Sequence, residues 1–190
     1  MKQTSEGIPL IETKRLLLTL PDMDAAPRLL DFALENDEHL ARWSSPHPEH
    51  YFTEVYWSEH LREAREEYAA GSAVRFVLLQ KQAPEKAVVG FCSFSQIFRG
   101  PFQACYLGYQ LDHRFVGENL MFEALTAAIT FMFDEQKLHR IMANYMPVNE
   151  RSGKLLRRLG FTVEGYARDY LFIANAWQDH ILTSLTNDKL

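Results

Sequence analysis

Runs of apolar residues bounded by turn residues predict the strands of this chain. The first run, IETKRLLLTL, ends at Pro21 and Asp22, which are typical turn residues. Three later runs follow one another directly and are separated by turns that contain proline or glycine, which favours an antiparallel meander. The pattern predicts strands at residues 11–20, 73–81, 87–98, 103–111 and 139–146, and two more after Gly160.

Other segments show the periodicity of helices. Within residues 53–70, Trp57, Leu61, Ala64 and Tyr68 share one face while charged residues fill the other, and Gly71 closes the segment. Helices are also predicted at residues 24–35 (Asp24 as cap, Pro27 in the first turn), 118–136 and 151–160, with a loop at WSSPHPEHYF.

The predicted helix at residues 118–136 is the most apolar one. Its polar residues form a single narrow stripe of Glu123, Thr126, Thr130 and Asp134, so we expect the helix to be mostly buried against the sheet. The predicted order of elements is β-α-α-β-β-β-α-β-α-β-β.

Length and composition predict one globular domain that covers residues 1–190. The 190 residues are 47% hydrophobic and 24% charged, and no repeat or low-complexity linker divides them. Cys92 and Cys105 both lie in apolar runs, which favours two buried thiols in a reducing compartment over a disulfide.

Charge and hydropathy patterning exclude several classes of partner. No apolar run approaches about 18 residues, and the first 15 residues resemble no signal peptide, so we expect a cytoplasmic protein without a membrane partner. The net charge of −5 does not favour direct binding of nucleic acid. The oligomeric state is left open.

The turn from Arg114 to Asn119 carries the first chemical signal. It joins a predicted strand to a long helix, and the first N–H groups of a helix have no internal acceptor and sit at the positive end of its dipole. Such a turn suits a phosphate or pyrophosphate, and Gly117 permits close backbone approach. No glycine pattern of a Rossmann or Walker site is present.

The turn and its surroundings resemble the GNAT acetyltransferase superfamily. Residues 114–119, RFVGEN, resemble its Q/R-x-x-G-x-G/A loop, with Asn119 in place of Gly or Ala; asparagine also tolerates left-handed backbone. Asn149 and Ser152 match an N-x-x-S pattern, and an L-G-F-x-x-E-G run begins at Leu159. Over nearly the whole chain the sequence is most similar to the RimJ/RimL branch of ribosomal-protein-alanine N-acetyltransferases, and within it to the RimJ type.

The resemblance implies a fold and a reaction. The fold is a mixed α/β GNAT fold, with a central, mostly antiparallel sheet of about seven strands and four helices. The reaction is direct transfer of acetyl from acetyl-CoA, the co-substrate, to the N-terminal α-amine of a protein, and a ribosomal protein with N-terminal alanine is the implied partner. No metal is implied.

The resemblance also implies roles for particular residues. The strand before the turn contacts pantetheine through backbone groups, the turn holds the pyrophosphate, and a backbone N–H near Leu111 stabilises the developing oxyanion. Ser152 protonates the leaving thiolate and Asn149 faces pantetheine, although an ordinary helix cap would also explain Asn149. The implied cofactor-binding residues are Tyr109, Gln110, Leu111, Arg114, Phe115, Val116, Gly117, Glu118, Asn119, Leu120, Asn149 and Ser152, with Ser152 and Asn149 also catalytic.

The sequence leaves the general base open. Glu164, Asp169 and Tyr106 are candidates, because a free α-amine with a pKa of about 8 needs only a modest base. The aromatic group Trp43, Tyr51, Phe52, Tyr56 and Trp57 supplies candidates for acceptor contact. A metal site at His47 and His50 and a nucleophilic Cys105 are set aside, whereas His113 could contact CoA or be a solvated residue of the turn.

Two alternatives remain at this stage. The same fold could acetylate a small-molecule amine such as a polyamine or aminoglycoside. It could also be an inactive module that binds CoA without catalysis, since Asn119 departs from the motif and the base is unidentified.

Overall fold

The computed structural model describes residues 2–3 and 7–188, and their strands form one sheet in the order β1-β2-β3-β4-β5-β6-β7-β9-β8. Neighbouring strands are antiparallel except β6 and β7, which are parallel. The strands are β1 (Lys2–Gln3), β2 (Pro9–Glu12), β3 (Leu16–Thr19), β4 (Val74–Gln80), β5 (Val88–Phe98), β6 (Ala104–Leu111), β7 (Arg140–Tyr145), β8 (Thr162–Ile173) and β9 (Ala176–Thr186).

The first predicted strand is in fact a hairpin. Strand β2 turns back on β3, with Ile11 opposite Leu18, so the single strand predicted at residues 11–20 is wrong. The Thr13 hydroxyl accepts from the amide of Leu16 at 2.8 Å and stabilises the turn. The chain reverses within the polar segment from Glu12 to Arg15, where a side chain competes for backbone hydrogen bonds. This split, together with β1, raises the strand count above the seven predicted.

Four α-helices accompany the sheet: α1 (Ala26–Ala41), α2 (Glu54–Ala70), α3 (Leu120–Asp134) and α4 (Glu150–Arg158). Helix α2 matches its prediction, with Thr53 as N-cap and Gly71 in left-handed conformation at its end. The start of α1 differs, because Asp22 rather than Asp24 caps a short 3-10 turn that leads into the helix. The loop predicted between α1 and α2 is confirmed.

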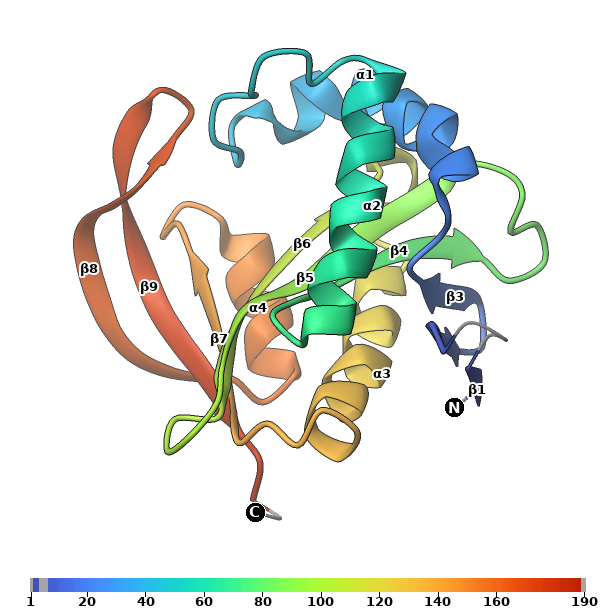
Figure 1. Cartoon of the computed structure of the whole chain (residues 1–190). Coiled ribbons are helices and arrows are strands. Elements are labelled where there is room, and N and C mark those ends of the chain that lie inside the picture. Colours follow the sequence, from blue (N-terminus) through green and yellow to red (C-terminus); the bar gives the residue numbers. More distant parts are fainter. Residues whose placement is uncertain (1, 4–6, 189–190) are drawn as a thin grey trace.

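Both faces of the sheet centre are covered, which explains the continuous apolar run of β4. Val77 and Leu79 join a core cluster with α1 and α2, whereas Phe76 and Leu78 join the cluster that contains α3 and Leu156 of α4. Because side chains alternate along a strand, the two helix pairs lie on opposite faces. Figure 1 shows α1 and α2 together on one side of the sheet. The predicted burial of α3 is confirmed.

Strands β8 and β9 form a long curved ribbon that extends beyond the rest of the sheet (Figure 1). Register shifts interrupt its pairing near Gly165 and between Ala167 and Leu171, and such irregularities increase bending and twist. Across the described residues, no helix combines the length and apolar character needed to span a membrane. Cys92 and Cys105 are buried free thiols, as predicted.

Candidate active site

The parallel pair β6 and β7 separates after a short contact. Their pairing covers only Ala104 to Tyr106 of β6, opposite Arg140 to Met142 of β7, although β6 continues to Leu111 and β7 to Tyr145. Beyond Tyr106 the edge of β6 that faces β7 therefore has no strand partner within the described residues, while β5 still pairs with its other edge. An unpaired strand edge offers backbone donors and acceptors to an extended ligand.

A cleft of about 950 Å³ opens at this separation. Its walls come from both sides of the sheet and from the turn before α3, so it is large enough for a cofactor-sized molecule. Sequence-predicted residues that line it are Tyr109, Gln110, Leu111, Val116, Gly117, Asn119, Leu120, Asn149 and Ser152.

The turn before α3 has the geometry expected of an anion site. Gly117 has φ +92°, and no atom lies within 4 Å of the place where a Cβ would stand, so its backbone is open. Asn119 also adopts a left-handed conformation, with φ +61°, at the N-cap of α3. The tolerance expected of asparagine at this position is confirmed. The amides that open α3 have no acceptor in a preceding turn and can bind a phosphate.

Helix α4 contributes three cations to the cleft. Arg151, Lys154 and Arg158 are spaced three and four positions apart, which places them on one helix face, and all three line the cleft. Arg158 donates to the side-chain oxygen of Asn119 at 2.9 Å and lies over the ring of Phe122. Sequence reasoning missed their role, although their i, i+3, i+7 spacing on the helix after β7 was the available signal.

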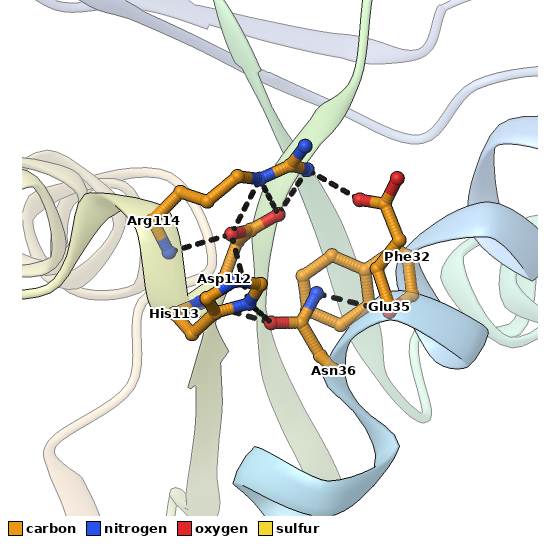
Figure 2. Close-up of polar contacts among 6 residues, drawn as sticks. All are labelled: Phe32, Glu35, Asn36, Asp112, His113 and Arg114. Carbon is orange, nitrogen blue, oxygen red and sulfur yellow. Dashed lines mark hydrogen bonds and ion pairs between the residues drawn. The ribbon is translucent and has the colours of Figure 1, made fainter.

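A buried carboxylate holds the turn in place (Figure 2). Asp112 is fully buried and accepts from the backbone amide of Arg114 at 2.8 Å and from its guanidinium at 2.5 to 3.1 Å. Burial alone would raise the pKa of Asp112, but hydrogen bonds from Arg114 and from Asn36 outweigh it and hold the pKa below the ordinary value. The charged carboxylate therefore fixes the start of the turn.

The same network ties the turn to α1. The side-chain oxygen of Asn36 accepts from both the backbone N–H and the ring Nδ1 of His113 at 2.9 Å, and its amide donates to the Phe32 carbonyl. Glu35 also forms an ion pair with Arg114 at 2.6 Å. His113 thus anchors the turn to α1, and its ring does not line the cleft.

Three sequence-predicted residues of the turn lie outside the cleft lining: Arg114, Phe115 and Glu118. The guanidinium of Arg114 sits between Asp112 and Glu35. Phe115 packs against the main core cluster, and the carbonyl of Glu118 accepts from Arg15. Their side chains support the turn from outside the cleft. A sequence motif does not distinguish such supporting residues from those that face the ligand.

Ser152 is paired with a tyrosine from the opposite wall. Its hydroxyl lies 2.6 Å from the phenol oxygen of Tyr109, and its backbone amide donates to the side chain of Asn149, the N-cap of α4. Burial raises the pKa of Tyr109 to about 12, with the bond to Ser152 acting in the opposite direction. The phenol is therefore protonated at neutral pH and is a proton donor. Sequence reasoning had assigned Tyr109 only a backbone contact.

The three sequence-predicted bases do not line the cleft. Glu164 is exposed and forms an ion pair with Arg140, which lowers its pKa. Asp169 is exposed on the outer ribbon, and its amide donates to Asp179. Tyr106 interacts with Tyr170 and lies at the end of the β6–β7 contact. The arrangement does not bring any of them together with Ser152.

An aromatic wall lines the cleft on the side of α1 and α2. Trp43, Tyr51, Tyr56 and Trp57 belong to it, whereas Phe52 does not. Tyr51 stacks on His47 at 3.9 Å between ring centroids, and His47 also contacts Asp37 at 3.0 Å. Cys105 is fully buried, and burial raises the pKa of its thiol to about 12, which leaves no reactive thiolate.

These features fit acetyl-CoA. The free edge of β6 suits the pantetheine amides, the open backbone at Gly117 suits the pyrophosphate, and the α4 cations complement phosphate charge. Residues 15–162 match the family model described as an acetyltransferase (GNAT) domain. The chain belongs to this family, and it is an acetyl-CoA-dependent N-acetyltransferase.

Comparison with its relatives confirms the predicted resemblance to the RimJ/RimL branch of the family. The [ribosomal protein uS5]-alanine N-acetyltransferase of Escherichia coli is 47% identical over 93% of this chain and 90% of that protein. The crystal structure of ribosomal-protein-S5-alanine acetyltransferase from Vibrio fischeri superposes with a TM-score of 0.89 at 38% identity, over 95% of this chain and 97% of that one. Mycobacterium smegmatis RimJ in complex with CoA-disulfide has a TM-score of 0.86 at 23% identity, over 96% and 88% of the two chains, and supports the fold.

Proposed function

We propose that this enzyme acetylates the N-terminal α-amine of a ribosomal protein that begins with alanine. The observation that carries the proposal is the single cleft in which the unpaired edge of β6, the anion turn and the Tyr109–Ser152 pair converge. The 47% identity to an enzyme named for alanine acetylation of ribosomal protein uS5 supports this acceptor. A ribosomal acceptor also supports the cytoplasmic location expected from the sequence.

In this proposal the two walls of the cleft hold acetyl-CoA. Backbone groups of Tyr109 to Leu111 pair with pantetheine, and the backbone from Val116 to Leu120 holds the pyrophosphate with help from Arg158. The side chains of Arg114, Phe115 and Glu118 act indirectly by shaping the turn. Asn149 caps α4 and so positions Ser152.

Tyr109 and Ser152 act together as the proposed acid. The acceptor nitrogen attacks the thioester carbonyl, the carbon–sulfur bond breaks, and the leaving sulfur gains a proton from the hydroxyl pair. The two hydroxyl oxygens lie 2.6 Å apart, so one hydroxyl can give this proton to sulfur and take a proton from the other. The second hydroxyl then regains its proton from solvent. The high pKa of Tyr109 keeps the pair protonated before the reaction.

The composition of the cleft argues against a polyamine or aminoglycoside acceptor. Among the described residues, no aspartate or glutamate lines it, whereas Arg75, Arg151, Lys154 and Arg158 do. A polycation needs carboxylates for recognition, and this lining offers none. A peptide N-terminus carries only one titratable amine and can lose its charge before reaction.

The proposal also treats residues 1–190 as one acetyltransferase domain, supported by the continuous sheet that runs from β2 to β8. An inactive CoA-binding module is disfavoured because the polar pair at the reaction centre is intact.

The experiment is mass spectrometry of peptides after incubation with acetyl-CoA. A peptide that begins with alanine, its N-terminally blocked form, a polyamine and an aminoglycoside are compared under the same conditions. We expect a single acetyl gain on the free alanine peptide alone. Acetylation of only the small amines would reject the peptide acceptor, and turnover of none would favour the inactive module.

A second experiment tests the site for the CoA phosphates. Arg158→Gln should raise the KM for acetyl-CoA about 10-fold, because one charge-assisted contact is lost. S-acetyl-pantetheine has no phosphate, so its kcat/KM should be unchanged by the substitution. An equal loss with both donors would show that Arg158 acts on the acceptor or on the fold.

A further inference from the structure

The cleft contains no carboxylate among its described residues, yet an acceptor amine must lose a proton. The lining residues that can act as a base near neutral pH are three histidines: His39, His60 and His180. They lie on different elements, α1, α2 and β9, and their positions relative to the opening between β6 and β7 favour His180 as the base.

His180 lies on β9 at the level where β7 ends. In the register of the two strands Tyr145 faces Ile181, so His180 is one position beyond the last paired residue of β7. This is the splayed end of the β6–β7 opening, where the cleft reaches the centre of the sheet. The side chain of His180 is only 4% exposed.

The ring of His180 is already oriented for proton acceptance. Its Nδ1 lies 3.0 Å from the carbonyl oxygen of Gln178, and a carbonyl can only accept, so Nδ1 carries the proton. This tautomer leaves the lone pair of the imidazole on Nε2. A histidine whose tautomer is fixed by a backbone carbonyl is a common arrangement for a general base.

The face of the sheet agrees with this role. Tyr145 packs against Gly153 of α4, so it points to the side of α3 and α4. Residues alternate along strands, and Asn144 and Leu182 share a register position, so His180 points to the opposite side. That is the side of α1 and α2, which carries the aromatic wall, whereas Tyr109 meets Ser152 of α4.

The other two histidines are less suited. His60 is enclosed by Tyr56 and Trp57 on α2 and lies near Arg75, away from the end of β7. His39 lies at the end of α1 beside His113, whose backbone belongs to the anion turn. Both lie on helices, whereas His180 lies on β9, the strand that pairs with β7 next to the opening.

We propose that Nε2 of His180 is the general base that removes a proton from the acceptor amine. This inference rests on the proposed peptide acetylation. The ammonium gives one proton to Nε2, and the nitrogen lone pair then forms the C–N bond. When the carbon–sulfur bond breaks, the thiolate takes a proton from the Tyr109–Ser152 pair, and the new amide nitrogen loses its second proton to solvent. The imidazolium returns its proton to solvent and the hydroxyl pair regains one from solvent, so that one proton is released overall.

The groups nearest the ring set its surroundings. The ring of Tyr170 on β8 lies 5.5 Å away between centroids, and its hydroxyl accepts from Asn144 of β7 at 3.2 Å. The half-buried Asp179 precedes His180 on β9, and its carboxylate interacts with Tyr166 and Arg168. The transient imidazolium therefore has the carboxylate of Asp179 next to it in sequence, with Tyr170 on β8 and Asn144 on β7 as the polar groups on the neighbouring strands.

The test compares two nucleophiles on one peptide. One peptide begins with alanine, and the other carries an aminooxy group in place of the α-amine, whose nitrogen is neutral at pH 7 without a base. For His180→Gln and His180→Asn we expect kcat with the amine peptide to fall about 100-fold. Turnover of the aminooxy peptide should stay within about threefold of wild type.

Two further measurements accompany this comparison. The acidic limb of the kcat–pH profile should be lost in His180→Gln, because the titrating base is gone. CoA affinity and the unfolding temperature should stay at wild-type values, and His50→Gln, at a histidine whose side chain is 75% exposed outside the cleft, is the matched control with unchanged turnover.

Three outcomes would overturn the proposal. Equal losses with both nucleophiles would show that His180 has a structural role, and full activity of His180→Gln would exclude it as the base. The same amine-specific loss in His39→Gln or His60→Gln, with His180→Gln active, would assign the base elsewhere. If the wild-type enzyme acetylates only a small amine, the peptide acceptor is wrong, and the comparison on that amine and its aminooxy analogue still tests His180.

Discussion

The phenol oxygen of Tyr109 lies 2.6 Å from the hydroxyl oxygen of Ser152, across the opening between β6 and α4. The residues are 43 positions apart in sequence, and the parallel β6–β7 pair brings their elements together before it separates. The two hydroxyls therefore share one task, and a substitution at either should affect the same step.

Removal of this pair should lower kcat more than it changes KM. Tyr109→Phe and Ser152→Ala should each reduce kcat about 100-fold, and the double variant should be little worse, because both remove one proton relay. Steady-state kinetics with saturating acetyl-CoA measures this effect. Tyr166→Phe, at an exposed tyrosine of the outer ribbon, is the matched control. Multiplying losses in the double variant would contradict a shared relay.

The anion turn could be predicted from sequence because its determinants are local. A strand, Gly117 and a helix start follow one another, and the left-handed Asn119 agrees with its residue type. The pairing of Ser152 with Tyr109 and that of Arg114 with Glu35 could not be predicted, because they depend on contacts between distant elements. The hairpin at Thr13 was missed for a different reason: the polar segment from Glu12 to Arg15 contains no glycine or proline to mark a turn, and a side-chain hydrogen bond stabilises the reversal.

The left-handed conformation of Asn119 leads to a graded prediction. Asn119→Gly keeps the backbone freedom and should leave CoA affinity within about threefold, whereas Asn119→Val should weaken it at least about 10-fold, because a β-branched residue is strained at φ +61°. Calorimetric titration with CoA measures both. Equal affinities for the two variants would show that the backbone conformation is not required. The lost bond to Arg158 is common to both variants and serves as an internal control.

The network around Asp112 predicts a pH-dependent loss of stability. Its pKa is held below the ordinary value, so its contribution is complete above about pH 4 and is lost as the pH falls through the folded-state pKa. Asp112→Asn should cost about 2 kcal/mol near neutral pH, a value reduced from that of a fully buried pair because Arg114 is 42% exposed.

Urea unfolding between pH 2.5 and 7 checks this prediction. The difference in stability between wild type and Asp112→Asn should shrink as the pH falls, since the wild-type carboxylate becomes protonated. Glu35→Gln, which removes the exposed partner of Arg114, should cost much less. A difference that stays constant with pH would show that the charge of Asp112 is not the stabilising feature.

The absence of a side chain at Gly90 allows β5 to approach the cofactor-facing part of β6 closely. A Cβ at this position would stand 2.3 Å from the carbonyl oxygen of Gln110 and 3.2 Å from the Cα of Leu111, and both are backbone atoms. The two strands pair here, with Gly90 opposite Leu111, so a side chain can be accommodated only if β6 moves. Gly90→Ala should destabilise the protein by about 1–3 kcal/mol and raise the KM for acetyl-CoA, because the displaced segment is the edge proposed to bind pantetheine.

Gly165→Ala is the matched control, since no atom lies within 4 Å of its Cβ position and its strand is remote from the turn. It should leave both quantities near their wild-type values. Thermal unfolding and acetyl-CoA kinetics at a temperature well below both transitions separate the two effects. A destabilised Gly90→Ala protein with an unchanged KM would show that this edge of β6 tolerates displacement, and that the cofactor is held by the turn at Gly117 and the cations of α4 instead.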